Sequence, residues 1–205
     1  MKNYRIKYTP KSYNEVVIHD LNNSIRPLLD KVASGQNCFN MLMFGTNGTG
    51  KTILAKMLTK AFYTSMRTSD YTVFWDMTQQ GVIQRLRQAT QLVPKSYTDV
   101  QWHILDEVDK CPNKSIYNEL HSIIQNESGH YFILTTNTIL DIPKGIQSRC
   151  MPFPIEAPIA SEFLGRAMDI LAQEGLSHSQ QKVFGALSAV ERDIRHYITA
   201  LELLE

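Results

Sequence analysis

Residues 45–52 have the types and spacing that bind phosphate groups. Glycines in this segment let backbone N–H groups turn inward around phosphate oxygens, because glycine has no Cβ to clash. The segment fits the pattern G-x-x-x-x-G-K-[ST] and lies between an apolar run at 41–44 and an amphipathic stretch at 51–63. This order of strand, loop and helix predicts a nucleoside triphosphate site at the positive end of a helix. Its residues are Gly45, Thr46, Asn47, Gly48, Thr49, Gly50, Lys51 and Thr52.

The last two residues of this loop have separate expected roles. The Lys51 ammonium is expected to meet the β- and γ-phosphates, and the Thr52 hydroxyl is expected to hold Mg²⁺. Both groups depend on the loop adopting the turn that its glycines allow. The sequence thus predicts a triphosphate and a magnesium ion bound together.

Two carboxylates end another apolar run, at 100–105. If this run is a strand beside the strand of the phosphate loop, Asp106 positions the Mg²⁺ shell and Glu107 polarises the attacking water. A solvated acidic turn is the alternative for the pair taken alone, and the phosphate loop favours the catalytic interpretation. Asp109 follows in the next turn, where we expect it to face solvent or to cap a helix.

Short apolar runs alternate with amphipathic stretches along most of the chain. Strands are predicted at 40–44, 71–75, 100–105, 131–135 and 151–155. Helices are predicted at 21–33, 51–63, 82–91 and 115–126. Such alternation is typical of the α/β class, here a parallel five-stranded sheet flanked by helices.

The character of the chain changes at three closely spaced prolines, Pro152, Pro154 and Pro158. Prolines at this density mark a linker. Beyond them only helices are predicted, at 161–174 with Ser161 as the N-cap, at 179–188 and at 190–204. We therefore expect an α/β nucleotide-binding domain at 1–155 and a small helical lid at 156–205.

Composition limits the classes of protein to which the chain can belong. It is 43% hydrophobic and 20% charged, as packed soluble domains are, and its net charge of +1 excludes a strongly basic DNA-coating protein. Cys38, Cys111 and Cys150 are far apart and form no C-x-x-C pair, so reduced thiols are expected instead of a disulfide or a zinc site.

The sequence offers no membrane segment. No apolar run reaches the ~20 residues that span a bilayer, and the polar first residues are not a signal peptide. We expect a soluble protein with no membrane partner. It would be cytoplasmic, or nuclear in a eukaryote, with a viral or phage-encoded protein in the host cytoplasm as an alternative.

Further polar residues follow the fourth predicted strand. Asn137 lies just beyond it, and Ser148, Arg149 and Cys150 come shortly after. Taken alone, they would be a turn residue and a surface arginine. Together with the phosphate loop and the acidic run Asp-Glu-x-Asp, they resemble the small subunits of clamp loaders, such as replication factor C and its phage counterparts. These AAA+ ATPases open ring-shaped sliding clamps and place them on primer–template DNA.

The resemblance extends to both ends of the chain. Tyr8-Thr9-Pro10-Lys11, followed by Val16 and Val17, is similar to the Tyr-Arg-Pro-Lys opening of the family, and residues 192–195 are similar to its Gly-Asp-x-Arg lid motif. The resemblance implies ATP as the nucleotide, with Mg²⁺. It also implies an adenine pocket formed by Tyr8, Pro10, Val16 and Val17.

Three polar residues receive roles from the resemblance. Asn137 would be the sensor that orients water near the γ-phosphate. Arg149 would be an arginine finger that reaches the ATP of a neighbouring subunit. Arg195 would contact the phosphates of its own chain.

The sequence departs from the family at several positions. Thr46 and Asn47 replace frequent prolines, and Arg192 or Glu191 stands where the lid motif has glycine. The sequence ends at Glu205, whereas clamp-loader subunits usually continue into a helical collar domain that holds the assembly together. A fragment, a minimal loader that assembles differently and a relative with another role therefore remain open.

A DNA contact is predicted around the third helix. Arg85, Arg87 and Lys95 could reach backbone phosphates, with nearby glutamines adding hydrogen bonds, and a solvated helix face is an equal alternative. The predicted partners are other AAA+ subunits, a sliding clamp and primer–template DNA. Two alternative functions remain: a helicase-loader or initiator-type ATPase, and a non-hydrolysing module that uses nucleotide for assembly.

Overall fold

The computed structural model describes residues 3–20, 24–91, 99–111, 116–126 and 129–204. Its centre is a five-stranded sheet in the order β2-β3-β4-β1-β5, with every neighbouring pair parallel. The strands are β1 Met41–Phe44, β2 Val73–Asp76, β3 Gln101–Asp106, β4 His130–Thr136 and β5 Met151–Pro154. The predicted α/β class and the parallel five-stranded sheet are confirmed.

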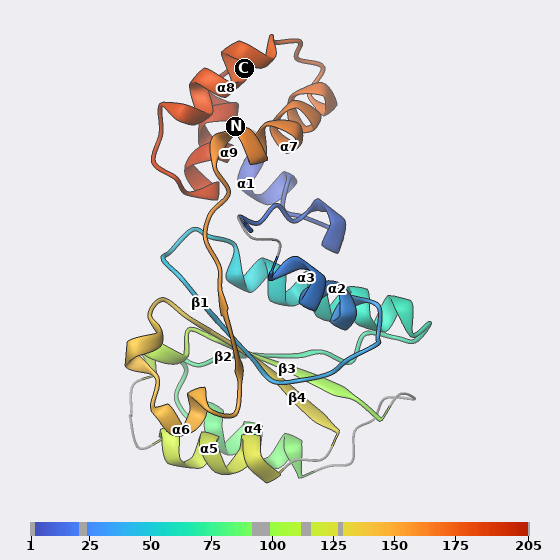
Figure 1. The fold of residues 1–205 in the computed structure, drawn as a ribbon, viewed down its shortest axis with the longest axis vertical. Helices are drawn as coiled ribbons and strands as arrows, with labels where there is room; N and C mark the ends of the chain where they lie inside the picture. The colour runs from blue at the N-terminus through green and yellow to red at the C-terminus, as the bar shows by residue number, and fades with distance from the viewer. Residues whose placement is uncertain (1–2, 21–23, 92–98, 112–115, 127–128, 205) are drawn as a thin grey trace.

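Helices cover both faces of the sheet (Figure 1). On one face lie α2 Arg26–Ala33 and α3 Lys51–Ser65, and on the other lie α4 Val82–Thr90, α5 Ile116–Asn126 and α6 Lys144–Gln147. Single 3₁₀ turns lie at η1 Tyr13–Glu15, η2 Val108–Lys110 and η3 Ile139–Asp141. This three-layer arrangement buries both sides of a parallel sheet, as such sheets require.

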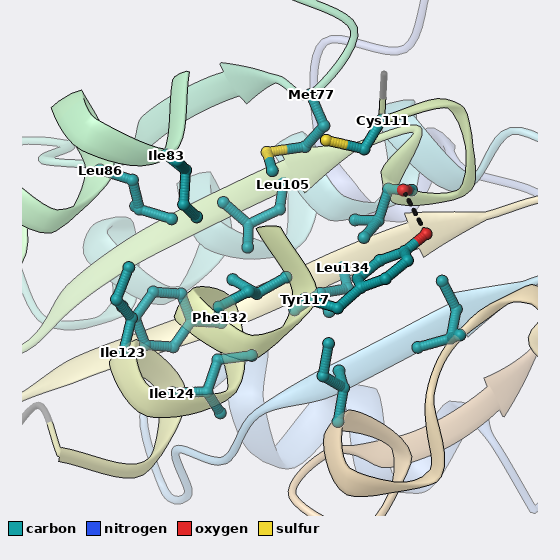
Figure 2. Packing of buried hydrophobic residues seen from close by; sticks show 14 of the residues in the cluster. Met77, Ile83, Leu86, Leu105, Cys111, Tyr117, Ile123, Ile124, Phe132 and Leu134 are labelled. Atoms are coloured by element: carbon teal, nitrogen blue, oxygen red, sulfur yellow. Dashed lines mark hydrogen bonds between the residues drawn. The ribbon is translucent and has the colours of Figure 1, made fainter. Parts of the chain in front are cut away.

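Side-chain alternation along the strands divides the core into two clusters. Met41, Met43 and Ile104 pack with α2 and α3, whereas their neighbours Leu42 and Leu105 pack on the opposite face. Figure 2 shows this second cluster, in which side chains of α4 and α5 meet those of β3 and β4. It also includes the Tyr117 hydroxyl, which donates a hydrogen bond to the carbonyl of Val108 at 3.1 Å.

A separate helical lid follows the sheet. It consists of α7 Ala160–Gln173, α8 Gln180–Ser188 and α9 Ile194–Glu202. Helix α1 Tyr4–Lys7 has no counterpart among the predicted helices. Its Tyr4 is buried with Tyr8 in the lid cluster, and Figure 1 places α1 beside α7 and α9. The domain boundary at residue 155 remains a prediction, and this packing adds the first described helix to the lid.

Adjacent residues mark where the chain passes from the lid core to the sheet core. Val16 is buried in the cluster under α2 and α3, whereas Val17 packs against the lid cluster. The two cores are therefore joined at one peptide bond here, as well as through the proline-containing segment after β5.

Several predicted helix boundaries are wrong for identifiable reasons. The last helix begins at Ile194 rather than at 190, because the Asp193 side chain accepts the backbone N–H of Arg195 and caps it. The first lid helix begins before Ser161, because Glu162 reaches back to the N–H of Ile159 at 2.8 Å. Part of the predicted helix 21–33 lies outside the described residues, and α2 begins at Arg26.

The strands differ from prediction by one or two residues at their ends. The second strand begins at Val73 rather than at 71 and continues to Asp76, and the fourth starts at His130. Prolines within β5 are tolerated because this strand lies at an edge of the sheet. Among the described residues, none of the helices combines the length and the apolar character that crossing a bilayer requires.

Candidate active site

The phosphate loop connects β1 to α3, as the sequence predicts. Gly48 has φ +75° and Gly50 has φ +86°, a left-handed conformation that favours glycine. The Lys51 ammonium lies 2.7 Å from the carbonyl oxygens of both Gly45 and Thr46 and 3.4 Å from Oδ1 of Asn137. The loop therefore surrounds the charged group that is expected to meet phosphate.

The carboxyl end of β3 lies directly beside the start of α3. Asp106 is on the same side of its strand as Ile104, two residues earlier, and so faces α3. The Thr52 hydroxyl donates to Oδ1 of Asp106 at 2.6 Å. A hydroxyl and a carboxylate are the hard oxygen ligands that Mg²⁺ prefers, so the residues predicted to hold the metal fit it chemically.

Glu107 occupies a strained backbone position. Its φ of 57° and ψ of 48° are left-handed, which costs a residue with a Cβ roughly 1–2 kcal/mol. Its N–H donates to the Thr135 hydroxyl at 3.0 Å, and its carboxylate forms an ion pair with Lys110. Strain of this kind persists only where surrounding contacts enforce it, and such places cluster at active sites.

Asp109 is oriented differently from the expectation. It is half-buried at the cavity and caps none of the described helices, and its Oδ2 accepts a hydrogen bond from Nδ2 of Asn137 at 3.1 Å. Its other oxygen, Oδ1, is buried without a hydrogen-bond partner among the described residues. The 3₁₀ turn η2 brings this carboxylate back toward the end of β4, which the chain order alone did not indicate. Asp109 thereby connects to Lys51 through the Asn137 amide.

Opposing effects act on the Lys51 ammonium. Desolvation by burial lowers its pKa, and the positive charge of Arg195 acts in the same direction. The carboxylates of Asp109, Asp106 and Glu107 oppose this shift, in that order among the acidic groups, and the net pKa is below the ordinary value of 10.5. The lysine is therefore enclosed and surrounded by acids.

A cavity of about 450 Å³ joins the phosphate loop, the strand ends and the lid. The four residues predicted to form the adenine pocket, Tyr8, Pro10, Val16 and Val17, all line this cavity. Its volume lies within the range of small-molecule sites. The structure thus brings the predicted base end and the predicted phosphate end together.

An ion pair lines the predicted base end of the cavity. Arg166 of α7 donates to Glu15 at 2.8 Å, and both residues line the cavity. The same guanidinium lies 3.4 Å from the carbonyl of Tyr8. A lid helix is thus tied to the segment that carries the predicted adenine pocket.

The lid also meets the phosphate loop directly. The N–H of Ile194 donates to the carbonyl of Gly48 at 3.1 Å, and the Asp193 carboxylate packs against the same glycine. Arg195 lines the cavity, as a phosphate-contacting role requires. Arg192, which with Glu191 is a candidate for the position of the family's glycine, donates to the carbonyl of Ala157 at 2.7 Å and thereby anchors the lid to its linker.

Arg149 lies away from this cavity. Its guanidinium donates to the carbonyl of Gly145 at 2.9 Å and to Gln125 at 3.0 Å, on the side of the sheet covered by α5 and α6. Arg149 is not among the described residues that line the cavity. The Arg149 guanidinium therefore does not reach the cavity of its own chain in this structure.

The predicted DNA contacts do not form one face. Arg85 is exposed and reaches Gln79 at 3.3 Å, whereas Arg87, two residues further along α4, pairs with Glu119 of α5 at 3.3 Å. Residues two apart on a helix point in different directions, so both cannot face one phosphate strand in these positions. Lys95 lies outside the described residues.

Sequence reasoning missed Thr135 and the pair formed by Glu15 and Arg166. Thr135 directly follows the apolar run of β4 and is only 1% exposed, so a hydroxyl at the end of a predicted buried strand was the available signal. Nothing in the local sequence could pair Glu15 with a residue in the lid.

The glycine loop, with its lysine and threonine beside the acidic end of a neighbouring parallel strand, defines a P-loop nucleotide-binding protein. The chain belongs to the AAA family, "ATPase family associated with various cellular activities", whose model matches residues 41–156.

Curated relatives narrow this assignment. The chain is 27% identical to "Replication factor C small subunit 2" of Pyrobaculum arsenaticum and 24% identical to "Replication factor C subunit 3" of Arabidopsis thaliana, in each case over 96% of this chain. These matches cover 61% and 64% of the relatives, so the chain spans less than two thirds of their length. The predicted resemblance to clamp-loader small subunits is confirmed.

Solved structures support the fold independently. The "Holliday junction branch migration motor" RuvB of Thermotoga maritima matches with a TM-score of 0.71 over 95% of this chain and 64% of that one, at 15% identity. A point variant of the same RuvB matches with a TM-score of 0.73. At this identity the likeness shows the fold alone.

Proposed function

We propose that this chain is the ATP-binding and ATP-hydrolysing subunit of a clamp loader, which opens a sliding clamp and places it on primer–template DNA. Its membership of the AAA family and its similarity to replication factor C small subunits support this proposal. ATP with Mg²⁺ is the proposed ligand pair.

The observation that carries the proposal is the meeting of three functional groups at one edge of the sheet. The Thr52 hydroxyl and the Asp106 carboxylate are hydrogen-bonded at 2.6 Å, and Thr52 and Lys51 line the same cavity. This set combines oxygen ligands for a metal with a positive charge for phosphate. Neither a structural glycine turn nor a solvated acidic turn would require it.

Different residues of the chain would bind the phosphates, hold the metal and activate the water. Lys51 would exchange its contacts with loop carbonyls for phosphate oxygens, and Thr52 and Asp106 would hold Mg²⁺, which offsets phosphate charge when bound. Glu107 would act as the base toward water, and Asn137, held by Asp109, would orient that water.

Arg149 would complete the site of a neighbouring subunit. Its position outside its own cavity supports this role, because an arginine that stabilises the transition state must reach the transferring phosphate. The proposed partners are therefore further AAA+ subunits, of this or another kind, in addition to the clamp and DNA. Arg85 on the exposed side of α4 is the proposed DNA contact among the described residues.

The catalytic assignment is tested by Glu107→Gln. We expect ATP binding within about twofold of wild type, and turnover of the assembled protein at least about a hundredfold lower, because a general base is lost. Glu191→Gln is the control, since the Glu191 side chain is 80% exposed and lies outside the cavity lining. Equal turnover by Glu107→Gln and wild type would contradict the assignment.

The shared site is tested by mixing two inactive variants. Arg149→Ala should bind ATP normally and lose turnover. A mixture with Glu107→Gln should recover turnover, because a seam that combines the intact Glu107 of one copy with the intact Arg149 of another is complete. Loss of ATP binding by Arg149→Ala would contradict an in-trans role. Co-purification of a sliding clamp, rather than a replicative helicase, tests the proposed ring.

A further inference from the structure

Thr135 lies at the centre of the acidic strand ends without having been assigned a role. It pairs with Met43 in the register of β4 and β1, and it shares a face with Ile133, toward α3. Its side chain is therefore enclosed beside the start of that helix, where a hydroxyl must find hydrogen-bond partners.

The hydroxyl of Thr135 makes two hydrogen bonds of opposite sense. It donates to Oδ1 of Asp106 at 2.6 Å and accepts from the backbone N–H of Glu107 at 3.0 Å. A hydroxyl has one proton and two lone pairs, and an ionised carboxylate only accepts, so the directions of both bonds are determined. One oxygen atom thus binds both the side-chain carboxylate of Asp106 and the backbone N–H of Glu107.

The first bond acts on the proposed metal ligand. Oδ1 of Asp106 receives a second hydrogen bond, from Thr52, also at 2.6 Å. With two donors on one oxygen, the carboxylate plane cannot rotate without breaking one of them. Thr135 thereby restricts the orientation of the Asp106 carboxylate beside Thr52.

The second bond acts on the proposed base. Glu107 has a left-handed backbone that an ordinary residue adopts only when its surroundings impose it. The bond from its N–H to Thr135 fixes the plane of the preceding peptide. The direction in which the Glu107 side chain leaves the strand end therefore depends on a hydroxyl of the neighbouring strand.

We propose that Thr135 is a positioning residue that sets the Asp106 and Glu107 carboxylates for metal binding and for water activation. The inference rests on the proposed ATP hydrolysis and extends it to a residue that acts through these two acids. Residues that orient metal ligands in this way typically affect metal affinity or activity by about 10–100-fold.

The test compares Thr135→Val, which keeps the shape and removes both bonds, with Thr135→Ser, which keeps the hydroxyl. Fluorescent-nucleotide titrations at a series of Mg²⁺ concentrations, and with chelator, give metal-dependent and metal-free affinities, and turnover is measured on the assembled protein. For Thr135→Val we expect about tenfold lower turnover and a severalfold higher Mg²⁺ requirement, with unchanged affinity in chelator. Thr135→Ser should recover both to within about threefold.

Thr59→Val is the matched control. Thr59 is fully buried in α3 and its hydroxyl donates to the carbonyl of Lys56, at 3.2 Å, so the variant removes a buried hydroxyl away from the acids. It should leave the Mg²⁺ requirement and turnover at wild-type values. Where Thr135→Val does not fold, Thr135→Ala, which removes the hydroxyl without adding a methyl group, is measured with the same expected result.

Two outcomes would overturn the inference, and they are distinguishable. If Glu107→Gln abolishes turnover while Thr135→Val keeps the wild-type rate and Mg²⁺ requirement, only the role of Thr135 is wrong. If the wild-type chain binds no ATP, or if Glu107→Gln turns over normally, the proposed function fails and this inference fails with it.

Discussion

Oδ2 of Asp109 accepts a hydrogen bond from the side-chain amide of Asn137, so an acid of the turn after β3 orients the polar residue that follows β4. The bond directs Oδ1 of Asn137 toward Lys51, 3.4 Å away. An acid, an amide and a lysine therefore form a chain along the edge of the cavity. Both contacts require Nδ2 of the Asn137 amide to face Asp109 and its Oδ1 to face Lys51.

Asp109→Ala should reduce turnover more than binding. Without its acceptor the Asn137 amide can rotate, so we expect about tenfold slower ATP turnover and an ATP affinity within about threefold of wild type. Steady-state kinetics and a nucleotide titration measure the two quantities. Asp141→Ala, at an exposed position in η3, is the control and should change neither. Wild-type kinetics for Asp109→Ala would contradict the role of this bond.

Gly48→Ala should damage the loop by two separable effects. The left-handed φ of +75° strains any residue with a Cβ, and that Cβ would lie 1.7 Å from a carboxylate oxygen of Asp193. We expect a stability loss of more than about 1 kcal/mol and at least about tenfold weaker ATP binding. Denaturant unfolding and a nucleotide titration provide the two measurements.

Gly175→Ala separates these effects. Gly175 has nearly the same φ, +74°, and apart from its chain neighbours no atom of the described residues lies within 4 Å of its added Cβ. Its variant should therefore lose about 1 kcal/mol from backbone strain alone and bind ATP normally. Equal losses for both variants would show that the contact with Asp193 contributes nothing.

The ion pair between Glu15 and Arg166 should couple the lid to the adenine-pocket segment. Its side chains are 32% and 14% exposed, so solvent screens it less than it screens a surface pair. A double-mutant cycle with Glu15→Gln and Arg166→Gln should give a coupling of about 1 kcal/mol in denaturant unfolding. The more exposed pair of Arg87 and Glu119 should give only a few tenths. Equal couplings would contradict a structural role for the first pair.

His103 should make stability depend on pH. Desolvation by burial, followed by the neighbouring His130, lowers the pKa of His103 to about 3 from 6.5. The unfolded chain therefore binds a proton between these values and the folded chain does not. Stability from this residue is complete above pH 6.5 and is lost as the pH falls toward 3, by at most about 1.4 kcal/mol per pH unit.

Urea unfolding of wild type and His103→Gln at several pH values measures this contribution. The variant should show a shallower decline below pH 6.5, because the imidazole that accepts the Trp75 N–H at 3.1 Å no longer titrates. His196→Gln is the control, since that side chain is 45% exposed. Parallel curves for wild type and His103→Gln would contradict the prediction.

Local patterns explain why much of the site was predictable. The phosphate loop needs a strand before it and a helix after it, and each polar strand end follows an apolar run, so the positions of Lys51, Asp106 and Asn137 follow from short stretches of sequence. Parallel strands end at the same edge, which brings these residues together. The parallel sheet followed from the alternation of strands and helices.

Contacts between distant segments explain what sequence reasoning missed. Asp109 turns inward because the end of β4 offers an amide, and Arg87 is engaged because α5 places Glu119 beside it. The packing of α1 on the lid likewise depends on residues near the other end of the sequence. No periodicity or spacing within one segment carries this information.

Val16 and Val17 are neighbours in the sequence that pack in two different cores, so the peptide bond between them connects the sheet to the lid. If the lid rotates, Tyr8 rotates with it, while Lys51 stays with α3 and the sheet. A nucleotide held at both ends would therefore set the angle between two bodies.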